Sequence, residues 1–287
     1  MKFAVLGAGG VGGLLGALLA RAGDSVVILH DGAPRDIRVE SGTFGDFTAE
    51  VETSPMLSEP VDAVLVTVKA TQLDEALRRV PGEALGDAVV IPFLNGLEHV
   101  EHLRSTYGSH VVAATIAVES TKVQPGFIRH TSPFTLIQMT GAEPVAARLK
   151  AAGPDVRMRD NELAMLWDKF SILAPMALLT THERASVGAI RERRREDLIA
   201  LIDEYATVAA AADGVTIDRA AVLGRVDSMQ PQMETSMQRD QAAGRPLEID
   251  ALGGALLRRA AKANVDTPVT KRLVEEIQSR AGASKSV

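Results

Sequence analysis

The chain has 287 residues, which corresponds to about two ordinary domains, and its 46% hydrophobic and 24% charged residues are typical of a soluble globular protein. Its net charge of −6 argues against a general nucleic-acid-binding protein, because such proteins usually carry a basic surface. The absence of cysteine excludes disulfides, thiolate metal sites and cysteine nucleophiles.

Apolar runs alternate with helical patterns through the N-terminal part of the chain. The apolar runs predict buried β-strands at residues 2–6, 25–29, 61–68, 88–93 and 111–118. The segments between them predict helices at residues 11–22, 71–79 and 97–105. Because strands that alternate with helices form right-handed βαβ units, we expect an α/β fold with a doubly wound sheet of the Rossmann type.

Two further segments, Gly42–Val51 and Phe127–Met139, alternate between apolar and polar residues, and the second contains Pro133. They predict antiparallel or edge strands. No stretch of about 18 or more uninterrupted apolar residues occurs, so we expect no membrane partner. Glycines interrupt the apolar N-terminus, which fits a strand–turn–helix better than a signal peptide. These features predict a soluble, cytoplasmic protein.

The composition changes near Asp160, beyond which Ala, Leu, Arg and Glu dominate. Helices are predicted at residues 161–179, 188–212, 218–229, 246–263 and 267–281. We therefore expect an N-terminal domain of residues 1–160 and an all-helical domain of residues 161–287. The short linker predicts that the two domains pack closely over a cleft. A homodimer is compatible with these features.

A glycine-rich loop follows the first predicted strand. Residues 7–12 read Gly-Ala-Gly-Gly-Val-Gly and fit the pattern G-x-G-x-x-G between a strand and a helix. The first glycine permits a tight turn, the second lets the backbone approach a pyrophosphate, and the third allows close helix–strand packing. The N-terminus of the helix would face the negative charge. The sequence thus assigns dinucleotide binding to Gly7, Gly9, Gly10 and Gly12.

Asp31 follows the second predicted strand, where a carboxylate would accept hydrogen bonds from the adenosine ribose and repel a 2′-phosphate. That arrangement favours NAD. Arg35 and Arg38 come close behind in the sequence and are candidates to clamp a 2′-phosphate, which would favour NADP. The cofactor is therefore expected to be NADP or NAD, with a slight preference for NAD.

Motifs beyond the glycine-rich loop resemble those of the ketopantoate reductase family. Thr67–Gln72 is similar to that family's V-K-A-x-Q segment, and Leu94–Gly96 to its Q-N-G segment with leucine in place of glutamine. Trp167–Lys169 resembles the W-x-K motif that opens its helical domain. Thr235–Asp240 and Pro246–Asp250 resemble its S-S-M-x-x-D and T-E-I-D motifs. The resemblance implies NAD(P)H-dependent reduction of a 2-oxo acid, such as ketopantoate in pantothenate biosynthesis, to the 2-hydroxy acid.

The resemblance also implies roles for single residues. Lys169 matches the catalytic lysine, the proton donor to the substrate carbonyl oxygen. Glu248 matches the glutamate that supports this lysine and helps to position substrate or cofactor. Ser236 matches a substrate-contacting serine. Asn95 matches an asparagine in the cleft, and Lys69 matches a basic residue near the nicotinamide end, so both are candidates for substrate and cofactor binding.

The residues around Lys169 agree with its implied role. Helical spacing places Lys169 beside Met165, Ile172 and Leu173, and no solvated stripe of polar residues accompanies it. A lysine in apolar surroundings either extends its ammonium to the surface or acts chemically. Desolvation would lower the pKa of its ammonium towards the range of a general acid.

The chain departs from the family in the same helix. Ketopantoate reductases place asparagines four and eight residues after the catalytic lysine, where this chain has Leu173 and Ala177. Neither side chain can replace the amide hydrogen bonds, so the substrate could be a more apolar carbonyl compound than ketopantoate. Pro175 predicts a kink in this helix.

Two other interpretations arise from parts of the sequence. The missing asparagines leave open a non-catalytic dinucleotide sensor or regulatory protein on the same fold, although the matches at Lys169 and Glu248 argue against it. His99 and His102 have a spacing at which they could share a metal, but no third ligand accompanies them. We therefore expect two histidines on a helix surface and no metal site.

Overall fold

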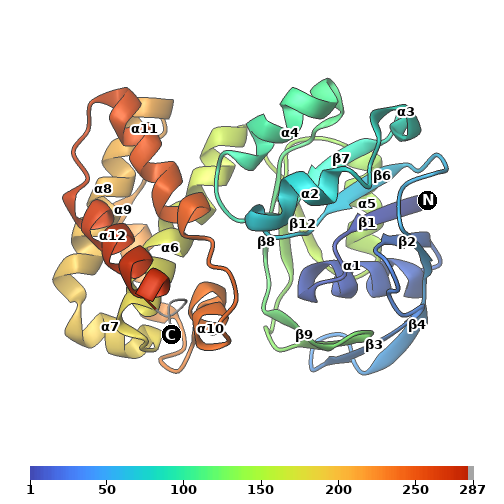
Figure 1. Ribbon diagram of the computed structural model, residues 1–287, viewed down its shortest axis with the longest axis horizontal. Coiled ribbons are helices and arrows are strands. Elements are labelled where there is room, and N and C mark those ends of the chain that lie inside the picture. The colour runs from blue at the N-terminus through green and yellow to red at the C-terminus, as the bar shows by residue number, and fades with distance from the viewer. Residues whose placement is uncertain (284–287) are drawn as a thin grey trace. The chain divides into compact units, whose positions relative to one another are not determined.

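A five-stranded parallel sheet organises the N-terminal part of the computed structural model, which describes residues 1–283 (Figure 1). Its order is β5-β2-β1-β6-β7, formed by Glu52–Ser54, Ser25–Leu29, Lys2–Leu6, Ala63–Val66 and Val89–Pro92. Apart from β5 and the first residues of β1 and β2, the strands are continuous apolar runs, which suits a sheet covered on both faces. The chain builds outward in opposite directions from β1 and β6, and the carboxyl ends at such a reversal form a ligand-binding crevice.

Short helices accompany this sheet. They are α1 (Gly10–Arg21), η1 (Ala70–Gln72), α2 (Leu73–Leu77), α3 (Gly82–Leu85), α4 (His99–Tyr107), η2 (Gly108–His110) and α5 (Glu143–Ala151). Leucines of α1 are fully buried against the sheet, because small residues elsewhere on this helix allow it to lie close. The predicted α/β architecture is confirmed.

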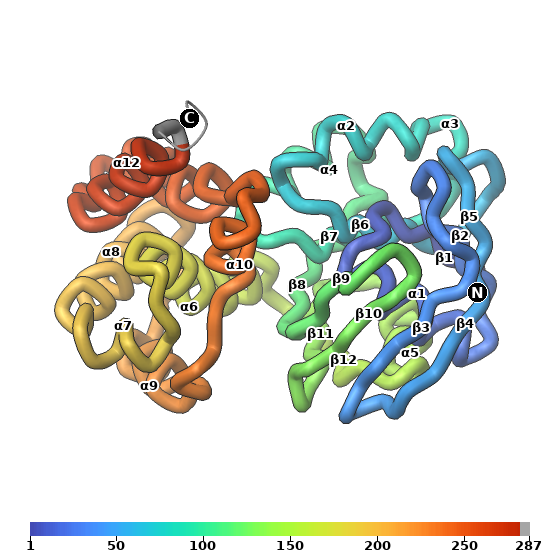
Figure 2. Tube along the Cα trace, turned by 60° about the horizontal axis from the view of Figure 1, so that its bottom comes forward, coloured from blue at the N-terminus to red at the C-terminus, as the bar shows by residue number. Residues whose placement is uncertain are grey.

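Two smaller sheets complete this part of the chain (Figure 2). One has the order β4-β3-β10-β9, formed by Phe47–Glu50, Asp36–Ser41, Phe127–His130 and Ser120–Gln124. The other has the order β12-β11-β8, formed by Asp155–Met158, Leu136–Met139 and Ala114–Ala117. The antiparallel pairings β3–β4, β9–β10 and β8–β11 confirm the predicted antiparallel additions.

The strand predicted at residues 111–118 was assigned to the wrong sheet. Its ordered part, β8, pairs antiparallel with β11 instead of extending the parallel sheet. Only a single parallel bridge, between Val90 and Val111, links this segment to β7. The apolar pattern indicated burial correctly, but it could not indicate the partner strand.

A buried histidine lies in the four-stranded sheet. His130 is 3% exposed, its Nδ1 is hydrogen-bonded to Ser41 Oγ at 2.8 Å, and its Nε2 lies 3.0 Å from Ser132 Oγ and 3.1 Å from Thr135 Oγ1. Its ring stacks on Phe44 with centroids 5.2 Å apart. Burial lowers the pKa of this imidazole below its usual value, because the charged form loses its hydration.

We expect His130 to make stability fall with acid. Above a pH of about 6.5 the imidazole is neutral in both folded and unfolded chains, so its contribution is fully present. As the pH falls further, the unfolded chain binds the proton first, and the free energy of unfolding decreases. Urea unfolding between pH 7 and pH 5 should therefore show a shallower decline for His130→Gln than for the wild type. Equal slopes would contradict this expectation.

The C-terminal part of the chain is helical, as predicted (Figure 1). It contains α6 (Glu162–Glu183), α7 (Val187–Arg193), α8 (Arg195–Asp213), α9 (Arg219–Ser228), α10 (Ser236–Ala242), the π-helical turn η3 (Asp250–Gly254), α11 (Ala255–Ala263) and α12 (Pro268–Ala283). The helix predicted at 188–212 is two helices, because the backbone leaves the helical region at Arg194. The helix predicted at 246–263 begins later, and α10 was not predicted.

Helix α6 is the central helix of this part. It runs without interruption from Glu162 to Glu183 and contains Pro175 in its interior. Trp167 and Phe170 are fully buried on it, and Phe170 packs against Tyr205 of α8 with ring centroids 5.2 Å apart. Among the described residues, α6 alone is long and apolar enough to cross a membrane, but 67% of its most apolar window is buried within the protein.

The chain divides into two compact units that do not follow a single boundary. The first contains Met1–Leu94 and His99–Met165, and the second contains Asn95–Glu98 together with Leu166–Val287. The short segment Asn95–Glu98, which follows β7 in sequence, thus packs with the helical unit. This segment carries one of the predicted site residues, Asn95.

Candidate active site

On helix α6, Lys169 lies on the side opposite Trp167, which anchors the helix in the core. Trp167 is fully buried, and its Nε1 donates a hydrogen bond to Asp213 Oδ2 at 2.7 Å. Asp213 Oδ1 also accepts a hydrogen bond from Arg259 Nη1 at 3.2 Å. Because successive residues of a helix turn by about 100°, Lys169 lies roughly 200° around the axis from Trp167. The tryptophan of the W-x-K segment therefore fixes the rotation of the helix that carries the lysine.

Three predicted residues come together in the helical unit as a hydrogen-bonded chain, here called the Lys169 triad. Lys169 Nζ donates to Asn95 Oδ1 at 3.0 Å, and Asn95 Nδ2 donates to Glu248 Oε2 at 3.3 Å. Glu248 is only 5% exposed, while Lys169 and Asn95 are half-buried. Residues that are far apart in sequence thus form one polar group at the end of a lysine side chain.

The surroundings change the acidity of Lys169. Burial lowers the pKa of its ammonium to about 8, and the negative charge of Glu248 opposes this shift only in part. A lysine with this pKa is mostly protonated at neutral pH, yet it releases its proton far more readily than an exposed lysine. These are the properties required of a general acid.

The segment that carries Asn95 is held against the turn η3. Gly96 has φ +99°, and a Cβ at this position would lie 2.7 Å from the carbonyl oxygen of Ala251. Arg258 of α11 grips Glu98 with two hydrogen bonds, Nε to Oε1 at 3.0 Å and Nη2 to Oε2 at 2.6 Å. Its Nη1 also donates to Asp250 Oδ1 at 2.6 Å. The sequence did not indicate Arg258, because its partner Glu98 is 160 residues away.

Ser236 lies apart from the contacts of the triad. It is the first residue of α10 and is exposed. The preceding Thr235 caps this helix by accepting a hydrogen bond from Gln238 N at 3.3 Å. Thr235 Oγ1 is also hydrogen-bonded to Thr180 Oγ1 of α6 at 2.8 Å, which ties α10 to α6.

The two positions at which the chain departs from the family differ in exposure. Leu173 follows Lys169 by about one helical turn and is half-buried, so the same face of α6 continues as an apolar surface. Ala177 is only 1% exposed and belongs to the core. Of the two, Leu173 is the accessible one.

The glycine-rich loop joins β1 to α1 in the first unit. Gly7 has φ +116°, a conformation that favours glycine, and a Cβ on Gly12 would lie 2.0 Å from Gly7 O. A Cβ on Gly10 would lie 2.2 Å from Ser120 O. A Cβ on Gly9 would have no neighbour within 4 Å. Three of the four glycines are therefore required by the fold itself, and Gly9 faces open space.

This loop fits a dinucleotide pyrophosphate. Gly9 is the N-cap of α1, and no side chain caps the first backbone N–H groups of that helix. Unsatisfied N–H groups and the helix dipole favour a bound anion. Thr67 Oγ1 donates to Leu6 O at 3.1 Å and Gly7 O at 3.0 Å, which fixes the loop to the end of β6. Lys69, two residues further on, is half-buried at the start of η1.

Asp31 follows β2 and has a partner that the sequence did not indicate. Arg79 Nη2 donates to Asp31 Oδ2 at 2.5 Å. The arginines considered from the sequence have other partners: Arg35 pairs with Glu50 at 3.5 Å and Arg38 with Glu40 at 2.6 Å.

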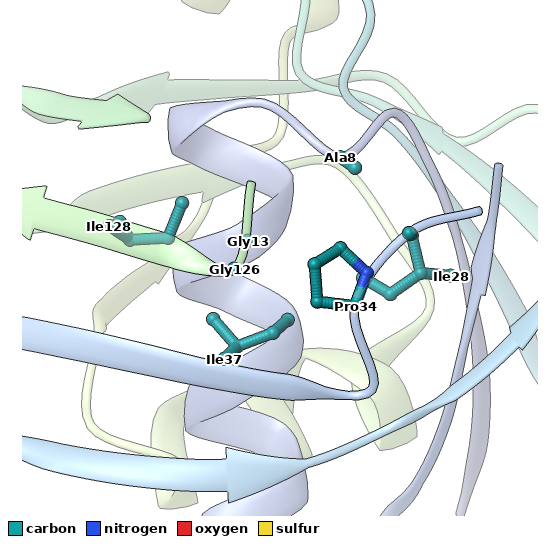
Figure 3. Close-up of a pocket in the computed structure, with 8 residues that line it drawn as sticks. Ala8, Gly13, Ile28, Pro34, Ile37, Gly126 and Ile128 are labelled. Carbon is teal, nitrogen blue, oxygen red and sulfur yellow. The ribbon is translucent and has the colours of Figure 1, made fainter. Parts of the chain in front are cut away.

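Neither of two cavities in the described part of the chain is lined by a residue of the Lys169 triad. A small apolar cavity of about 20 Å³ lies beside the glycine-rich loop, lined by Ala8, Gly13, Ile28, Ala33, Pro34, Ile37, Gly126 and Ile128 (Figure 3). It has room for about one water molecule, and its lining is apolar. A polar hollow of about 420 Å³ is lined by His182, Glu183, Arg184 and Arg280. His182 is thirteen residues along α6 from Lys169, or about 20 Å.

The expectation of two surface histidines was wrong for one of them. His102 is exposed, and its Nε2 lies 2.7 Å from Asp74 Oδ1. His99 is 6% exposed, because the first turn of α4 packs into the core of the unit. The helix also begins at His99, two residues later than predicted.

Comparisons with known proteins cover almost the entire chain. The family model described as ketopantoate reductase PanE/ApbA matches residues 3–139, and the model of its C-terminal domain matches residues 161–281. A 2-dehydropantoate 2-reductase of Mycobacterium tuberculosis is 33% identical over 94% of this chain and 95% of its own length. A PanE/ApbA family ketopantoate reductase of Ralstonia eutropha superimposes with a TM-score of 0.90 at 28% identity, covering 99% of this chain and all of that one. A ternary structure of D-mandelate dehydrogenase with NADH and anilino(oxo)acetate has a TM-score of 0.89 at 20% identity, covering 99% of each chain, which indicates a shared fold.

Proposed function

Because the chain belongs to the ketopantoate reductase family, we propose that it uses NAD(P)H to reduce a 2-oxo acid whose side chain is more apolar than that of ketopantoate. The chain is a nicotinamide-dependent oxidoreductase that acts on a small molecule. The substrate, the choice of NADH and a cytoplasmic location are parts of the proposal. The observation that carries it is the Lys169 triad, with an apolar residue one turn further along the same helix face.

Each residue of the Lys169 triad has a separate role in the proposed reaction. When bound, a reduced nicotinamide would supply the hydride that the carbonyl carbon accepts. Lys169 donates a proton to the carbonyl oxygen, where negative charge develops. Asn95 Oδ1 accepts a hydrogen bond from Lys169 Nζ and so limits the directions in which the ammonium can point. Glu248 holds the amide of Asn95 in turn and stabilises the protonated lysine.

The remaining predicted residues complete the proposal through the family resemblance. Ser236 would contact the substrate, and its exposure at the start of α10 leaves its hydroxyl accessible. Lys69 would contact the nicotinamide end of the cofactor or the substrate carboxylate from the carboxyl end of β6, where ligands of α/β sheets bind. Gly7, Gly9, Gly10 and Gly12 would hold the pyrophosphate.

The apolar character of Leu173 supports the choice of substrate. The half-buried side chain of Leu173 offers apolar contact surface but no hydrogen bond. A substrate hydroxyl placed against it would lose its hydrogen bond to water and gain none in return. A site that hydrogen-bonds a substrate hydroxyl discriminates strongly against analogues that lack the hydroxyl. An apolar site prefers the analogue without the hydroxyl, but by a smaller factor. We therefore expect turnover of branched or aromatic 2-oxo acids to exceed turnover of ketopantoate.

Leu173→Asn should raise kcat/KM for ketopantoate by roughly 10- to 100-fold, the scale of one regained hydrogen bond in a site partly shielded from water. The same variant should lose activity on an apolar 2-oxo acid such as 2-oxoisocaproate. Initial rates of NADH and NADPH oxidation with both substrates test this. Leu173→Met is the matched control, because it keeps an apolar side chain of similar volume. Ala177→Asn is unsuitable, since it would bury an amide in the core.

Two outcomes would contradict the proposal. Efficient ketopantoate reduction by the wild type would show that Leu173 does not exclude this substrate. No oxidation of either dinucleotide with any 2-oxo acid, despite tight cofactor binding, would favour the non-catalytic sensor.

A further inference from the structure

The ion pair between Asp31 and Arg79 follows β2, at the position that recognises the adenosine ribose in dinucleotide-binding folds. NADH and NADPH differ at this ribose. Asp31 stands just beyond the carboxyl end of β2. NADH carries a 2′-hydroxyl on that ribose, and NADPH carries a 2′-phosphate. A carboxylate suits the first group and repels the second, whereas a guanidinium binds the phosphate.

Arg79 is fixed at this place independently of Asp31. Its Nη1 donates to Pro55 O at 2.7 Å, and its backbone carbonyl accepts a hydrogen bond from Leu57 N at 2.7 Å. Pro55 immediately follows β5, the strand that pairs with β2. Two contacts to the segment after β5 thus hold Arg79 beside the end of β2 even when the Asp31 carboxylate is removed.

The pair is accessible to a ligand. The side chain of Asp31 is 69% exposed and that of Arg79 is 31% exposed. The hydrogen bond from Arg79 holds the pKa of the Asp31 carboxyl below its usual range, so both groups are charged at neutral pH. Each charge therefore cancels most of the attraction or repulsion that the other would exert on a nearby phosphate.

The other arginines near this strand are engaged elsewhere. Arg35 pairs with Glu50, and Arg38 pairs with Glu40 while its guanidinium lies 5.0 Å from the centre of the Phe127 ring. Arg38 belongs to β3 of the four-stranded sheet, and Arg35 immediately precedes this strand. Of these three arginines, Arg79 is the one that pairs with Asp31.

We propose that Arg79 is the residue that sets the response of this site to a 2′-phosphate, and that Asp31 masks it. This assignment rests on the proposed dinucleotide-binding function. In the native chain, Asp31 Oδ2 accepts a hydrogen bond from Arg79 while Oδ1 stays available to the ribose hydroxyls, so NADH is favoured. When the Asp31 carboxylate is removed, the Arg79 guanidinium stays in place and can bind the 2′-phosphate. The specificity of the site is thus a property of the pair.

The test measures the dissociation constants of NADH and NADPH by isothermal titration calorimetry, without any substrate. Asp31→Ala should shift the affinity ratio towards NADPH by about tenfold or more, because the phosphate gains a charge-assisted partner. Asp31→Ala/Arg79→Met should lose this gain. Arg79→Met alone should weaken NADPH binding, because the Asp31 carboxylate then repels the 2′-phosphate without a neighbouring positive charge. It should change NADH binding much less. The gain in the Asp31→Ala variant should also shrink strongly at high salt.

Two controls make the result specific to Arg79. Glu50→Ala releases Arg35 in the same way that Asp31→Ala releases Arg79, and it should leave the ratio unchanged. Arg78→Met removes the exposed arginine next to Arg79 and should also have no effect. A double variant that keeps the NADPH gain, or a Glu50→Ala variant that reproduces it, would overturn the assignment. Binding of neither dinucleotide by the wild type would overturn the proposed function itself.

Discussion

Lys169→Ala is expected to lower kcat by roughly 10²- to 10⁴-fold, the range over which a positioned general acid contributes. Removing the ammonium takes the proton donor away from the carbonyl oxygen while the glycine-rich loop, which belongs to the other unit, is unchanged. The dissociation constant of NADH should therefore stay within a few-fold of the wild-type value. Steady-state rates with the best 2-oxo acid, together with calorimetric titration of the cofactor, measure the two effects separately. Lys150→Ala, which removes an exposed lysine of the first unit, is the matched control.

The pH dependence separates a catalytic lysine from a structural one. The acid form of Lys169 is the ammonium, so kcat for reduction should be constant below its pKa of about 8 and fall as the pH rises beyond it. The carboxylate of Glu248 raises this pKa by favouring the charged form. Glu248→Gln should therefore move the fall in kcat to lower pH. A pH profile that is identical in Glu248→Gln and the wild type would contradict the proposed role of Lys169.

The parts of the fold that were predictable from sequence are those whose local pattern is decisive. β1 and β2 have the predicted ends, because each is an apolar run of four residues preceded by one polar residue. β5 was not predicted, since Glu52–Ser54 is short and polar and becomes a strand only by pairing with β2. Helix α10 is held by the Thr235 cap and the Thr180 contact, neither of which creates a periodic pattern.

In the candidate site, too, some residues could be identified from the sequence and others could not. Lys169, Glu248 and Asn95 were identified because they stand in motifs that resemble those of the ketopantoate reductase family. Arg258, which holds the segment of Asn95 through Glu98, and Arg79, which pairs with Asp31, were not identified. Their partners lie 160 and 48 residues away, and an arginine on a helical segment has an ordinary surface role by default. Long-range charge pairs of this kind leave no periodic trace in the sequence.

Gly9→Val is expected to weaken the binding of both dinucleotides by roughly 10- to 100-fold without unfolding the protein. A Cβ on Gly9 meets no atom within 4 Å, and the backbone there, with φ −88° and ψ −168°, suits any residue. The fold thus gives no reason for a glycine at this position, and a ligand does. The branched side chain would occupy the space in which the pyrophosphate approaches the N–H groups of α1, and overpacking of that order costs about 1–3 kcal/mol.

Gly12→Ala is the matched comparison, because its added carbon would lie 2.0 Å from Gly7 O and must displace the loop. That variant should lose thermal stability as well as affinity, whereas Gly9→Val should lose affinity alone. Thermal unfolding followed by circular dichroism and calorimetric titration with NADH distinguish the two results. Because a methyl group on Gly12 disturbs β1 and α1 directly, its effect on binding alone would prove little. Unchanged NADH affinity in folded Gly9→Val would show that the open side of this loop does not receive the pyrophosphate.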